Sequence, residues 1–402
     1  MKEKILITGI DHYGRGIGKL YNKVIFIANA LIGEEVECLI VSNKKNYCEG
    51  KVINYLKKST DRVNPMCRYY DICGGCNIMH MNYNNQLKFK ENKLKEILNK
   101  FALVDEKVIK PIIKSDELYY RNKITLQVKD KLGLYEDKSY KIVNINKCII
   151  SNQHINDIIE KLNELDLSNI NQIVIRSSEI TDQIMIILCI YNKIVEKIFI
   201  DKLSPFCTSL IKKYKNEYKV LHGNNFIVEE LNNYKFKISA DSFFQVNTKQ
   251  AIKMYDLVKK YCGNNILDLY CGTGTIGIYA NKNHLTGIEM NQYAIKDAIE
   301  NAKINGVSAK YICDDVKNSI SKINTKYDTI IIDPPRNGLD NESINNILKI
   351  NPLTVIYVSC DPVTLARDLN CLKKKYNIVE IVPFDMFPST FHVECVCVLN
   401  RC

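Results

Sequence analysis

The segment Ser359-Cys360-Asp361-Pro362 carries the residue best suited to covalent chemistry. It follows the apolar run LTVIYV and precedes the helical pattern VTLARDLN, so Cys360 is predicted at a strand-to-helix junction. The positive end of a helix dipole lowers the pKa of a nearby thiol and favours the thiolate. A thiolate can add to C6 of a pyrimidine ring and thereby activate C5 for alkylation. Cys360 is therefore a candidate nucleophile, although on its own it could also be a small buried residue.

Glu394 in FHVECVCVL is the candidate base. An alkylated C5 must lose its proton before the thiol can leave, and a carboxylate can accept that proton. The apolar run around Glu394 predicts partial burial, which would raise its pKa toward neutrality. Taken alone, Glu394 could equally be a charge at the edge of a sheet. His392 could orient a substrate or serve as a structural histidine.

A glycine-rich turn at Asp268–Thr275 (DLYCGTGT) is the candidate cofactor site. It is predicted to end the strand NNILDLY and open a helix, where glycines let the backbone approach a ligand closely. The segment matches neither the dinucleotide fingerprint nor a Walker loop. Glu289 ends the next strand, LTGIE, where a carboxylate can accept hydrogen bonds from ribose hydroxyls. Together these features resemble motif I and its acidic partner in class I methyltransferases.

Asp333-Pro334-Pro335-Arg336 ends a further strand, where such enzymes place residues that face the substrate. Methyltransferases that act on amino groups typically have an aromatic ring after the prolines. Arg336 stands at that position in this sequence. The segment therefore argues against methylation of N6 of adenine or of an amide.

Cys67, Cys73 and Cys76 form a compact cluster with the pattern C-x5-C-G-G-C. Three thiols are too few for a closed four-cysteine site, and Cys148 in NINKCII is the leading candidate for the fourth ligand. Four thiolates can hold zinc or a [4Fe–4S] cluster, and the spacing leaves both open, with unligated thiols as a third interpretation. Cys48 is a competing ligand, but it falls in the N-terminal domain. The spacing excludes the C-x3-C-x2-C pattern of radical enzymes.

The elements that position these residues are predicted to form three domains. Residues 1–58 contain short strands separated by turn residues, as in a small OB-like β-barrel, and the glycine-rich segment Asp11–Gly18 is predicted to be a tight turn. Residues 59–237 form an α+β central domain with the cysteine cluster. An amphipathic helix within 84–105 is expected to pack on the catalytic domain. Residues 238–402 alternate strands and helices, which predicts a Rossmann-like α/β sheet.

The charge of the chain suits a polyanionic partner. The formal net charge is +11, and residues 41–100 carry twelve basic residues against five acidic ones, a surplus of seven. A solvated Lys-rich surface would look the same on charge alone. No apolar run is long enough to cross a bilayer, and the N-terminus lacks a signal-peptide pattern. We therefore expect a cytoplasmic protein with reduced cysteines and no membrane partner.

Across essentially its full length the chain resembles the RNA uracil-5-methyltransferase family, in particular its iron–sulfur-containing 23S rRNA branch. The matching stretches are FFQVN (243–247), DLYCGTGTIG (268–277), DPPRNG (333–338), VSCDPVTLARDL (358–369) and HVECV (392–396). The resemblance implies that Cys360 is the nucleophile and that Glu394 is the base that resolves the adduct. It also implies the residues that bind S-adenosylmethionine, which are Gln245, Tyr270, Glu289 and Asp333. Gln245 and Asp333 would also lie near the target base.

The resemblance also assigns the cysteines and the N-terminal domain. CRYYDICGGC looks like the family's cluster loop, and residues 119–148 look like the segment that closes it. This favours a [4Fe–4S] cluster on Cys67, Cys73, Cys76 and Cys148. Because methyl transfer from a sulfonium needs no electron, we expect the cluster to be structural and RNA-positioning. The N-terminal strands resemble a TRAM domain, an RNA-binding module that would hold the phosphate backbone while a flipped uridine enters the catalytic domain.

The expected partner is 23S rRNA, before or during ribosome assembly, with no obligate protein partner. Two positions depart from the family pattern: the alignment at Asp315 can slip by one residue, and Thr275 stands where relatives often have Asn. The same reaction on a tRNA uridine is the first alternative, and a non-catalytic RNA-binding iron–sulfur protein is the second. Methylation of cytosine C5 is disfavoured because such RNA enzymes usually place a cysteine where this chain continues with Pro335 and Arg336.

Overall fold

The computed structural model describes residues 2–129, 131–192, 197–323 and 325–402. The chain divides into two compact units. The first consists of Met1–Lys93, Tyr135–Val143 and Phe387–His392, and the second of Leu94–Leu134, Asn144–Met386 and Val393–Cys402. Within the described residues, no helix is both long and apolar enough to span a lipid bilayer. The three domain boundaries expected from the sequence stay a prediction.

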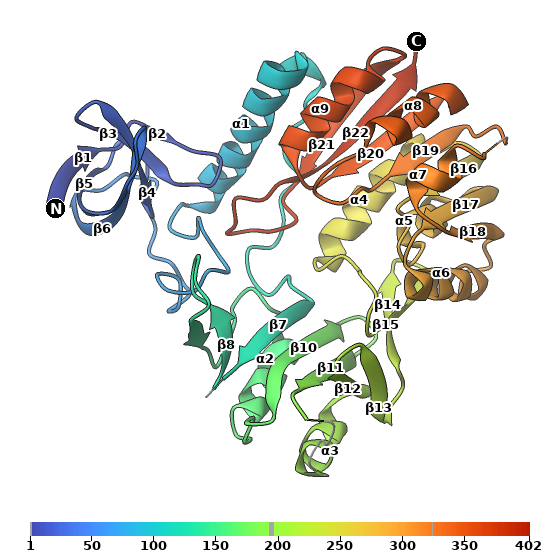
Figure 1. Ribbon diagram of the computed structural model, residues 1–402, viewed down its shortest axis with the longest axis horizontal. Helices are drawn as coiled ribbons and strands as arrows, with labels where there is room; N and C mark the ends of the chain where they lie inside the picture. The colour runs from blue at the N-terminus through green and yellow to red at the C-terminus, as the bar shows by residue number, and fades with distance from the viewer. Residues whose placement is uncertain (1, 130, 193–196, 324) are drawn as a thin grey trace. The chain divides into compact units, whose positions relative to one another are not determined.

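The first unit begins with six strands that wrap around a small core of their own (Figure 1). In sheet order they are β1 (Lys2–Leu6), β5 (Glu35–Asn43), β6 (Tyr47–Lys57), β4 (Lys23–Ala28), β3 (Gly16–Leu20) and β2 (Gly9–Ile10). Alternate residues point inward, as Ile25 and Ile27 of β4 do. The predicted tight turn is confirmed, because Asp11 accepts backbone N–H bonds from Tyr13 and Arg15.

Helix α1 (Tyr83–Ala102) follows the cysteine loop, which we define as residues 67–76. Its observed bounds agree with the amphipathic helix predicted within 84–105. The apolar side chains Leu94, Ile97, Leu98 and Ala102 are buried in one core with Leu267, Ile330 and Tyr357 of the C-terminal α/β region. The expectation that this helix packs on the catalytic domain is confirmed for these residues.

A mixed seven-stranded sheet forms the middle of the chain. In sheet order its strands are β13 (Glu217–Gly223), β12 (Ser209–Tyr214), β11 (Gln183–Ile190), β10 (Ile170–Ser178), β7 (Lys123–Val128), β8 (Leu132–Tyr135) and β9 (Ile142–Asn144). It is accompanied by helices α2 (Gln153–Leu162) and α3 (Lys197–Leu203) and by the hairpin of β14 (Phe226–Leu231) and β15 (Tyr234–Ser239). The predicted α+β character of this region is confirmed.

The catalytic sheet also has seven strands, and its first five are parallel. In sheet order they are β18 (Ala309–Cys313), β17 (His284–Glu289), β16 (Asn265–Leu269), β19 (Thr329–Ile332) and β20 (Thr354–Ser359), followed by β22 (Glu394–Arg401) and β21 (Tyr376–Phe384). β22 is antiparallel to both of its neighbours. The central strands β16, β19 and β20 are buried apolar runs, as a sheet covered on both faces requires.

Helices cover the two faces of the catalytic sheet (Figure 1). One layer contains α4 (Thr248–Tyr261), α5 (Thr275–Ala280) and α6 (Gln292–Ile304), and the other contains α7 (Val316–Ile320), α8 (Asn341–Ile350) and α9 (Pro362–Leu372). This doubly wound arrangement is the Rossmann-like class that the sequence predicted. Ligands of such sheets bind at the carboxyl ends of the parallel strands.

Candidate active site

The predicted site residues converge on the carboxyl edge of the catalytic sheet. Tyr270 follows β16, Glu289 ends β17, and Asp333 follows β19. Cys360 follows β20, and Glu394 begins the antiparallel strand β22. Because Ser359 pairs with Cys395 in the sheet, Cys360 and Glu394 lie at the same end of adjacent strands. Side chains far apart in the sequence are thus brought to one edge.

The turn after β16 forms a cradle with space above its backbone. Gly272 has φ +52°, and a Cβ built on it would have no atom within 4 Å. At Gly274, with φ +77°, a Cβ would lie 2.6 Å from the Tyr311 hydroxyl oxygen, so only glycine fits. The backbone N–H of Gly277 donates to Asp268 Oδ2 at 3.0 Å. Asp268 therefore fixes the start of α5 behind the turn.

Glu289 is oriented by the backbone beside this cradle. Its carboxylate accepts the N–H of Gly272 at 3.2 Å and the N–H of Asn291 at 2.8 Å. Asp268 Oδ1 is buried and lacks a hydrogen-bond partner among the described residues. An open glycine turn, a positioned carboxylate and an orphaned acceptor fit the hydroxyl and amino groups of S-adenosylmethionine. Tyr270 has φ +62°, and burial raises the pKa of its hydroxyl to about 12.

The structure corrects the expectation for the Cys360 thiol. Cys360 follows β20 directly, and α9 begins at Pro362 with Asp361 as its N-cap, as predicted. However, burial raises the pKa of Cys360 to about 12, and the negative charges of Glu394 and Asp333 add to the rise. Arg336 opposes it. Near neutral pH the Cys360 thiol is therefore protonated, because burial and the neighbouring carboxylates outweigh the helix dipole.

Two buried carboxyl groups, Glu394 and Asp333, interact with this thiol. Burial raises the pKa of Glu394 to about 8, Asp333 adds to the rise, and Arg336 opposes it. Burial also raises the pKa of Asp333 to about 7 and that of Asp268 to about 8. The prediction that Glu394 is buried with a raised pKa is confirmed. These groups can exchange protons near neutral pH, as acid–base catalysts do.

Gln245 lies in the segment that leads into α4, and two residues that the sequence analysis did not single out hold this segment. Asn122 donates its side-chain N–H groups to the Gln245 carbonyl at 3.1 Å and to the Thr248 hydroxyl at 3.0 Å. Asn247 caps α4 and donates to the carbonyl of Met386. Asn122 lies in the segment 119–148 and Asn247 ends the motif FFQVN, so both belong to stretches that resemble the family. That resemblance was the only sequence feature that could have indicated their role. Phe243 is 67% exposed, so its ring is free to contact a substrate.

The segment before the candidate base, residues 387–392, is held inside the first unit. The Ser389 carbonyl accepts backbone N–H bonds from Asn77 at 2.9 Å and Ile78 at 3.1 Å, directly after the cysteine loop. Gln86 accepts the Ser389 N–H, and the buried Lys90 donates to the Phe387 carbonyl. The His392 ring lies 4.3 Å from that of Phe391. A substrate-orienting role for His392 stays a prediction.

The four predicted cluster ligands are half-buried cysteines. Cys67, Cys73 and Cys76 belong to the first unit and Cys148 to the second. Cys73 Sγ accepts the Gly75 N–H at 3.4 Å, a bond that suits a thiolate ligand. Among the described side chains, no group of three or more His, Cys, Asp or Glu residues is arranged to hold a metal ion. The competing Cys48 is buried in the barrel core.

The doubly wound sheet, with the antiparallel strand β22 between β20 and β21, has the fold of S-adenosylmethionine-dependent methyltransferases. Two family models match the chain: the tRNA (Uracil-5-)-methyltransferase model over residues 82–402 and the TRAM domain model over residues 2–53. The chain belongs to this uracil-5-methyltransferase family of RNA methyltransferases and carries an N-terminal TRAM domain. The resemblance seen in its sequence motifs is thereby confirmed at the level of the family.

Relatives match over nearly their whole length. An uncharacterized RNA methyltransferase of Caldanaerobacter subterraneus is 36% identical and covers 100% of this chain and 98% of its own. One from Clostridium acetobutylicum is 33% identical, with 99% and 96% covered. Among solved structures, the tRNA (uracil-54, C5)-methyltransferase of Pyrococcus abyssi with S-adenosyl-L-homocysteine matches with a TM-score of 0.83. It is 29% identical, covering 98% of this chain and 99% of its own.

Proposed function

We propose that the protein transfers a methyl group from S-adenosylmethionine to C5 of a uridine in 23S rRNA, with Cys360 as nucleophile and Glu394 as base. The main support for this proposal is the pairing of β20 with β22, because it brings Cys360 and Glu394 close together at the carboxyl edge of the sheet. A thiol beside a carboxyl group of raised pKa is the combination that C5 methylation of uracil requires.

The reaction proceeds through a covalent adduct. Cys360 Sγ bonds to C6 of the uracil while the thiol proton passes to a neighbouring carboxylate, and the electrons of the C5–C6 double bond move onto C5 and O4. C5 takes the methyl group that S-adenosylmethionine supplies. Glu394 then accepts the C5 proton, the double bond forms again, and the Sγ–C6 bond breaks. Gln245, Tyr270, Glu289 and Asp333 bind the cofactor, and Gln245 and Asp333 also lie near the target base.

The raised pKa values at this edge support the order of these steps. Because the pKa of Cys360 is about 12, its proton must be taken up as the sulfur attacks. Asp333 and Glu394, with pKa values of about 7 and about 8, are acceptors that also release protons near neutrality. The positive charge of Arg336 favours the charged forms of both Cys360 and Glu394.

The choice of RNA rests on different observations. The cysteine pattern C-x5-C-G-G-C and the TRAM domain favour 23S rRNA by resemblance. The solved Pyrococcus abyssi enzyme acts on uracil 54 of tRNA, and its likeness over 98% of this chain favours a tRNA uridine as the second candidate.

Methyl transfer to purified RNA tests both assignments. Labelled S-adenosylmethionine is offered with unmodified 23S rRNA and, separately, with unmodified bulk tRNA, and the nucleosides are analysed. We expect label in 5-methyluridine from 23S rRNA. Label only in tRNA would move the assignment to the second candidate. Label in neither RNA, or in another nucleoside, would contradict the proposed reaction.

We further propose that Cys67, Cys73, Cys76 and Cys148 hold a [4Fe–4S] cluster. The donor set and the N–H bond to Cys73 Sγ support this. Protein purified without oxygen should contain iron and acid-labile sulfide in equal amounts. Cys76→Ser should lose them, whereas Cys402→Ser, at an exposed cysteine, should keep them. Zinc in place of iron and sulfide would contradict this assignment.

A further inference from the structure

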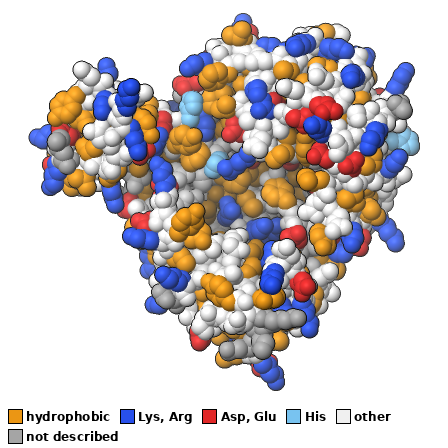
Figure 2. Space-filling model, in the orientation of Figure 1, with side chains coloured by type: hydrophobic (Ala, Val, Ile, Leu, Met, Phe, Trp, Pro, Cys, Tyr) orange, Lys and Arg blue, Asp and Glu red, His pale blue; other side chains and the backbone are white. Residues whose placement is uncertain are grey.

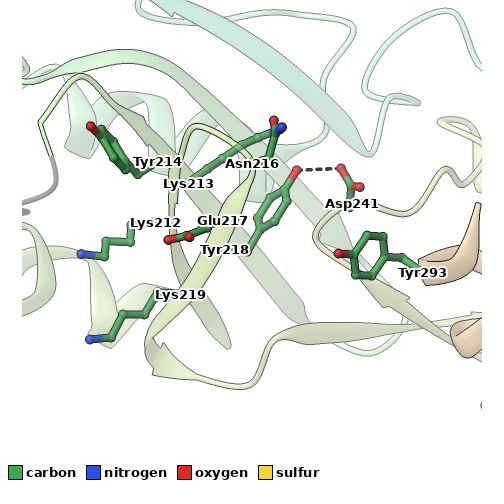
Figure 3. A pocket seen from close by; sticks show the side chains of 9 residues that line it. All are labelled: Lys212, Lys213, Tyr214, Asn216, Glu217, Tyr218, Lys219, Asp241 and Tyr293. Atoms are coloured by element: carbon green, nitrogen blue, oxygen red, sulfur yellow. Dashed lines mark hydrogen bonds between the residues drawn. The ribbon is translucent and has the colours of Figure 1, made fainter.

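A pocket of about 900 Å³ opens along the hairpin of β12 and β13 (Figure 3). Most of its lining is polar or aromatic. The residues are Lys212, Lys213, Tyr214, Asn216, Glu217, Tyr218, Lys219, Asp241 and Tyr293. None of the roles assigned above uses this pocket.

The hairpin register places the cationic and aromatic side chains on both faces of the hairpin, because successive cross-strand pairs alternate sides. Lys212 stands opposite Lys219 across the two strands, and both side chains point the same way in Figure 3. Lys213 stands opposite Tyr218, and its ammonium nitrogen lies 4.8 Å from the centroid of that ring. Figure 2 shows further Lys and Arg side chains over the surface of this part of the chain, the green region of Figure 1.

The other wall of the pocket comes from two segments of the candidate active site. Tyr218 donates its hydroxyl to Asp241 at 2.6 Å, and Asp241 precedes the exposed Phe243 by two residues. Tyr293 lies in the first turn of α6, four residues after Glu289, and is 52% exposed. The pocket therefore opens beside the segments that carry the predicted base-binding and cofactor-binding residues.

The chemistry of the lining fits a nucleic-acid strand better than a small ligand. Small-molecule pockets are lined mainly by apolar side chains, whereas this one combines three lysines with three tyrosines. Ammonium groups bind phosphates, and tyrosine rings stack on unpaired bases regardless of their identity. Lys123 lies near Asp241 and offsets its negative charge, and Glu217 can accept hydrogen bonds from base amino groups.

We propose that this pocket binds single-stranded RNA next to the target uridine. The lysines of β12 and β13 hold its phosphates, and Tyr293 stacks on one of its bases. The strand then leads along Asp241 and Phe243 to Gln245. This inference rests on the proposed function, since it concerns the same RNA. It assigns the central sheet a share of the RNA-binding energy in addition to the TRAM domain.

The first test removes two pocket charges in the double variant Lys213→Ala/Lys219→Ala. We expect the KM for RNA to rise about tenfold. The slope of log K against log salt for binding the substrate RNA should fall by about 1.4, which is about 0.7 for each phosphate that the variant no longer neutralises. The kcat and the KM for S-adenosylmethionine should stay within about twofold, because the variant removes no group at the sheet edge. The matched control is Lys349→Ala/Lys374→Ala, which removes the same charge from positions outside the pocket.

The second test removes the stacking ring. Tyr293→Ala should raise the KM for RNA about fivefold or more, whereas Tyr293→Phe, which keeps the ring, should stay within about twofold of wild type. In addition, 4-thiouridine placed beside the target uridine should crosslink to the β12–β13 hairpin in the wild type.

The outcomes separate this proposal from the proposed function. If the wild type methylates no RNA, the proposed function fails and this inference fails with it. If the wild type methylates RNA while the pocket variants match the control in KM and salt slope, the pocket assignment alone is wrong. A rise in the KM for S-adenosylmethionine without a change in the KM for RNA would make the pocket a cofactor site and overturn the proposal.

Discussion

Glu34 and Glu394 are two buried glutamates with opposite electrostatics. Glu34, in the TRAM domain, is 0% exposed and forms a two-pronged ion pair with Arg62, with N–O distances of 2.5 and 2.7 Å. Burial acts to raise its pKa, but the bonds from Arg62 and from the N–H groups of Leu31 and Ser59 prevail, and the pKa is lowered. Glu394 is 6% exposed, and burial raises its pKa to about 8.

Since both side chains are buried, their different pKa values depend on the groups that each one contacts. A paired carboxylate keeps its charge and stabilises the fold. A carboxyl group that is buried beside another acid, as Glu394 is beside Asp333, holds a proton that it can give up near neutral pH. Such a group costs stability and provides chemistry. Substitutions at the catalytic edge should therefore change the reaction, and substitutions at the Glu34–Arg62 pair should change stability.

Removing the nucleophile should have the largest effect. Cys360→Ala is expected to lower kcat by at least about 10⁴-fold, because no other group can form the bond to C6. The measurement is label transfer to the RNA substrate with matched protein concentrations. The control is Cys371→Ala, at a half-buried thiol on α9, which should remain active. Turnover by Cys360→Ala within tenfold of wild type would contradict a covalent mechanism.

Glu394→Gln should lower kcat by about 10² to 10⁴-fold, because the C5 proton then has no base to accept it. The bond from Cys360 to C6 still forms, so a covalent protein–RNA complex should accumulate. Denaturing electrophoresis with labelled RNA detects it as a band of lower mobility. The double variant with Cys360→Ala should lack that band. A fast, adduct-free reaction by Glu394→Gln would move the base role to another residue.

Glu34→Gln should destabilise the protein and leave the chemistry intact. Breaking a buried ion pair from one side costs roughly 3 kcal/mol or more, because Arg62 stays buried without its counter-charge. Calorimetry should show a lower unfolding temperature for the first unit. The kcat of the folded protein at low temperature should stay within about twofold of wild type. A large loss of kcat without a loss of stability would mean that this pair takes part in catalysis.

The smallest expected effect concerns the free energy of unfolding, to which Glu394 and Glu34 should contribute with opposite pH dependence. The folded pKa of Glu394 is about 8 against an ordinary 4.5, so the folded state binds the extra proton between these values and the free energy of unfolding falls as pH rises. Glu394→Gln should therefore gain stability relative to wild type between pH 5 and 9, by roughly 2–4 °C for each kcal/mol. Glu34 has a lowered pKa, so its contribution is present at neutral pH and is lost on acidification below 4.5. Parallel pH profiles for the two Gln variants would contradict this contrast.

The sequence predicted the parts of the catalytic domain that depend on local order. The turn after Asp268, Glu289 at the end of β17, and Pro362 at the start of α9 all lie where their patterns placed them. Each of these positions follows from strand and helix signals within a few residues. The helix predicted within 84–105 agrees with α1 for the same reason.

The features that escaped prediction depend on long-range contacts. The helix start at Cys360 pointed to a lowered pKa, but burial of the thiol, together with Glu394 and Asp333 on neighbouring strands, raises the pKa instead. The bond from Asn122 to the Gln245 carbonyl joins residues 123 positions apart, which no local pattern reveals. The cysteine ligand set stays a prediction for the same reason, since Cys148 is far from the other three in sequence.

The position of β22 ties activity to the complete sheet. This strand follows β20 and β21 in the chain but lies between them in the sheet. The strand order of the sheet therefore requires β22, which begins with Glu394, to pair with both neighbours. A slip of one residue in the pairing of Ser359 with Cys395 would turn Glu394 to the opposite face. A molecule with that error could still bind the cofactor at the glycine turn and yet be inactive. An assay of methyl transfer is therefore a stricter test of the strand register than an assay of cofactor binding.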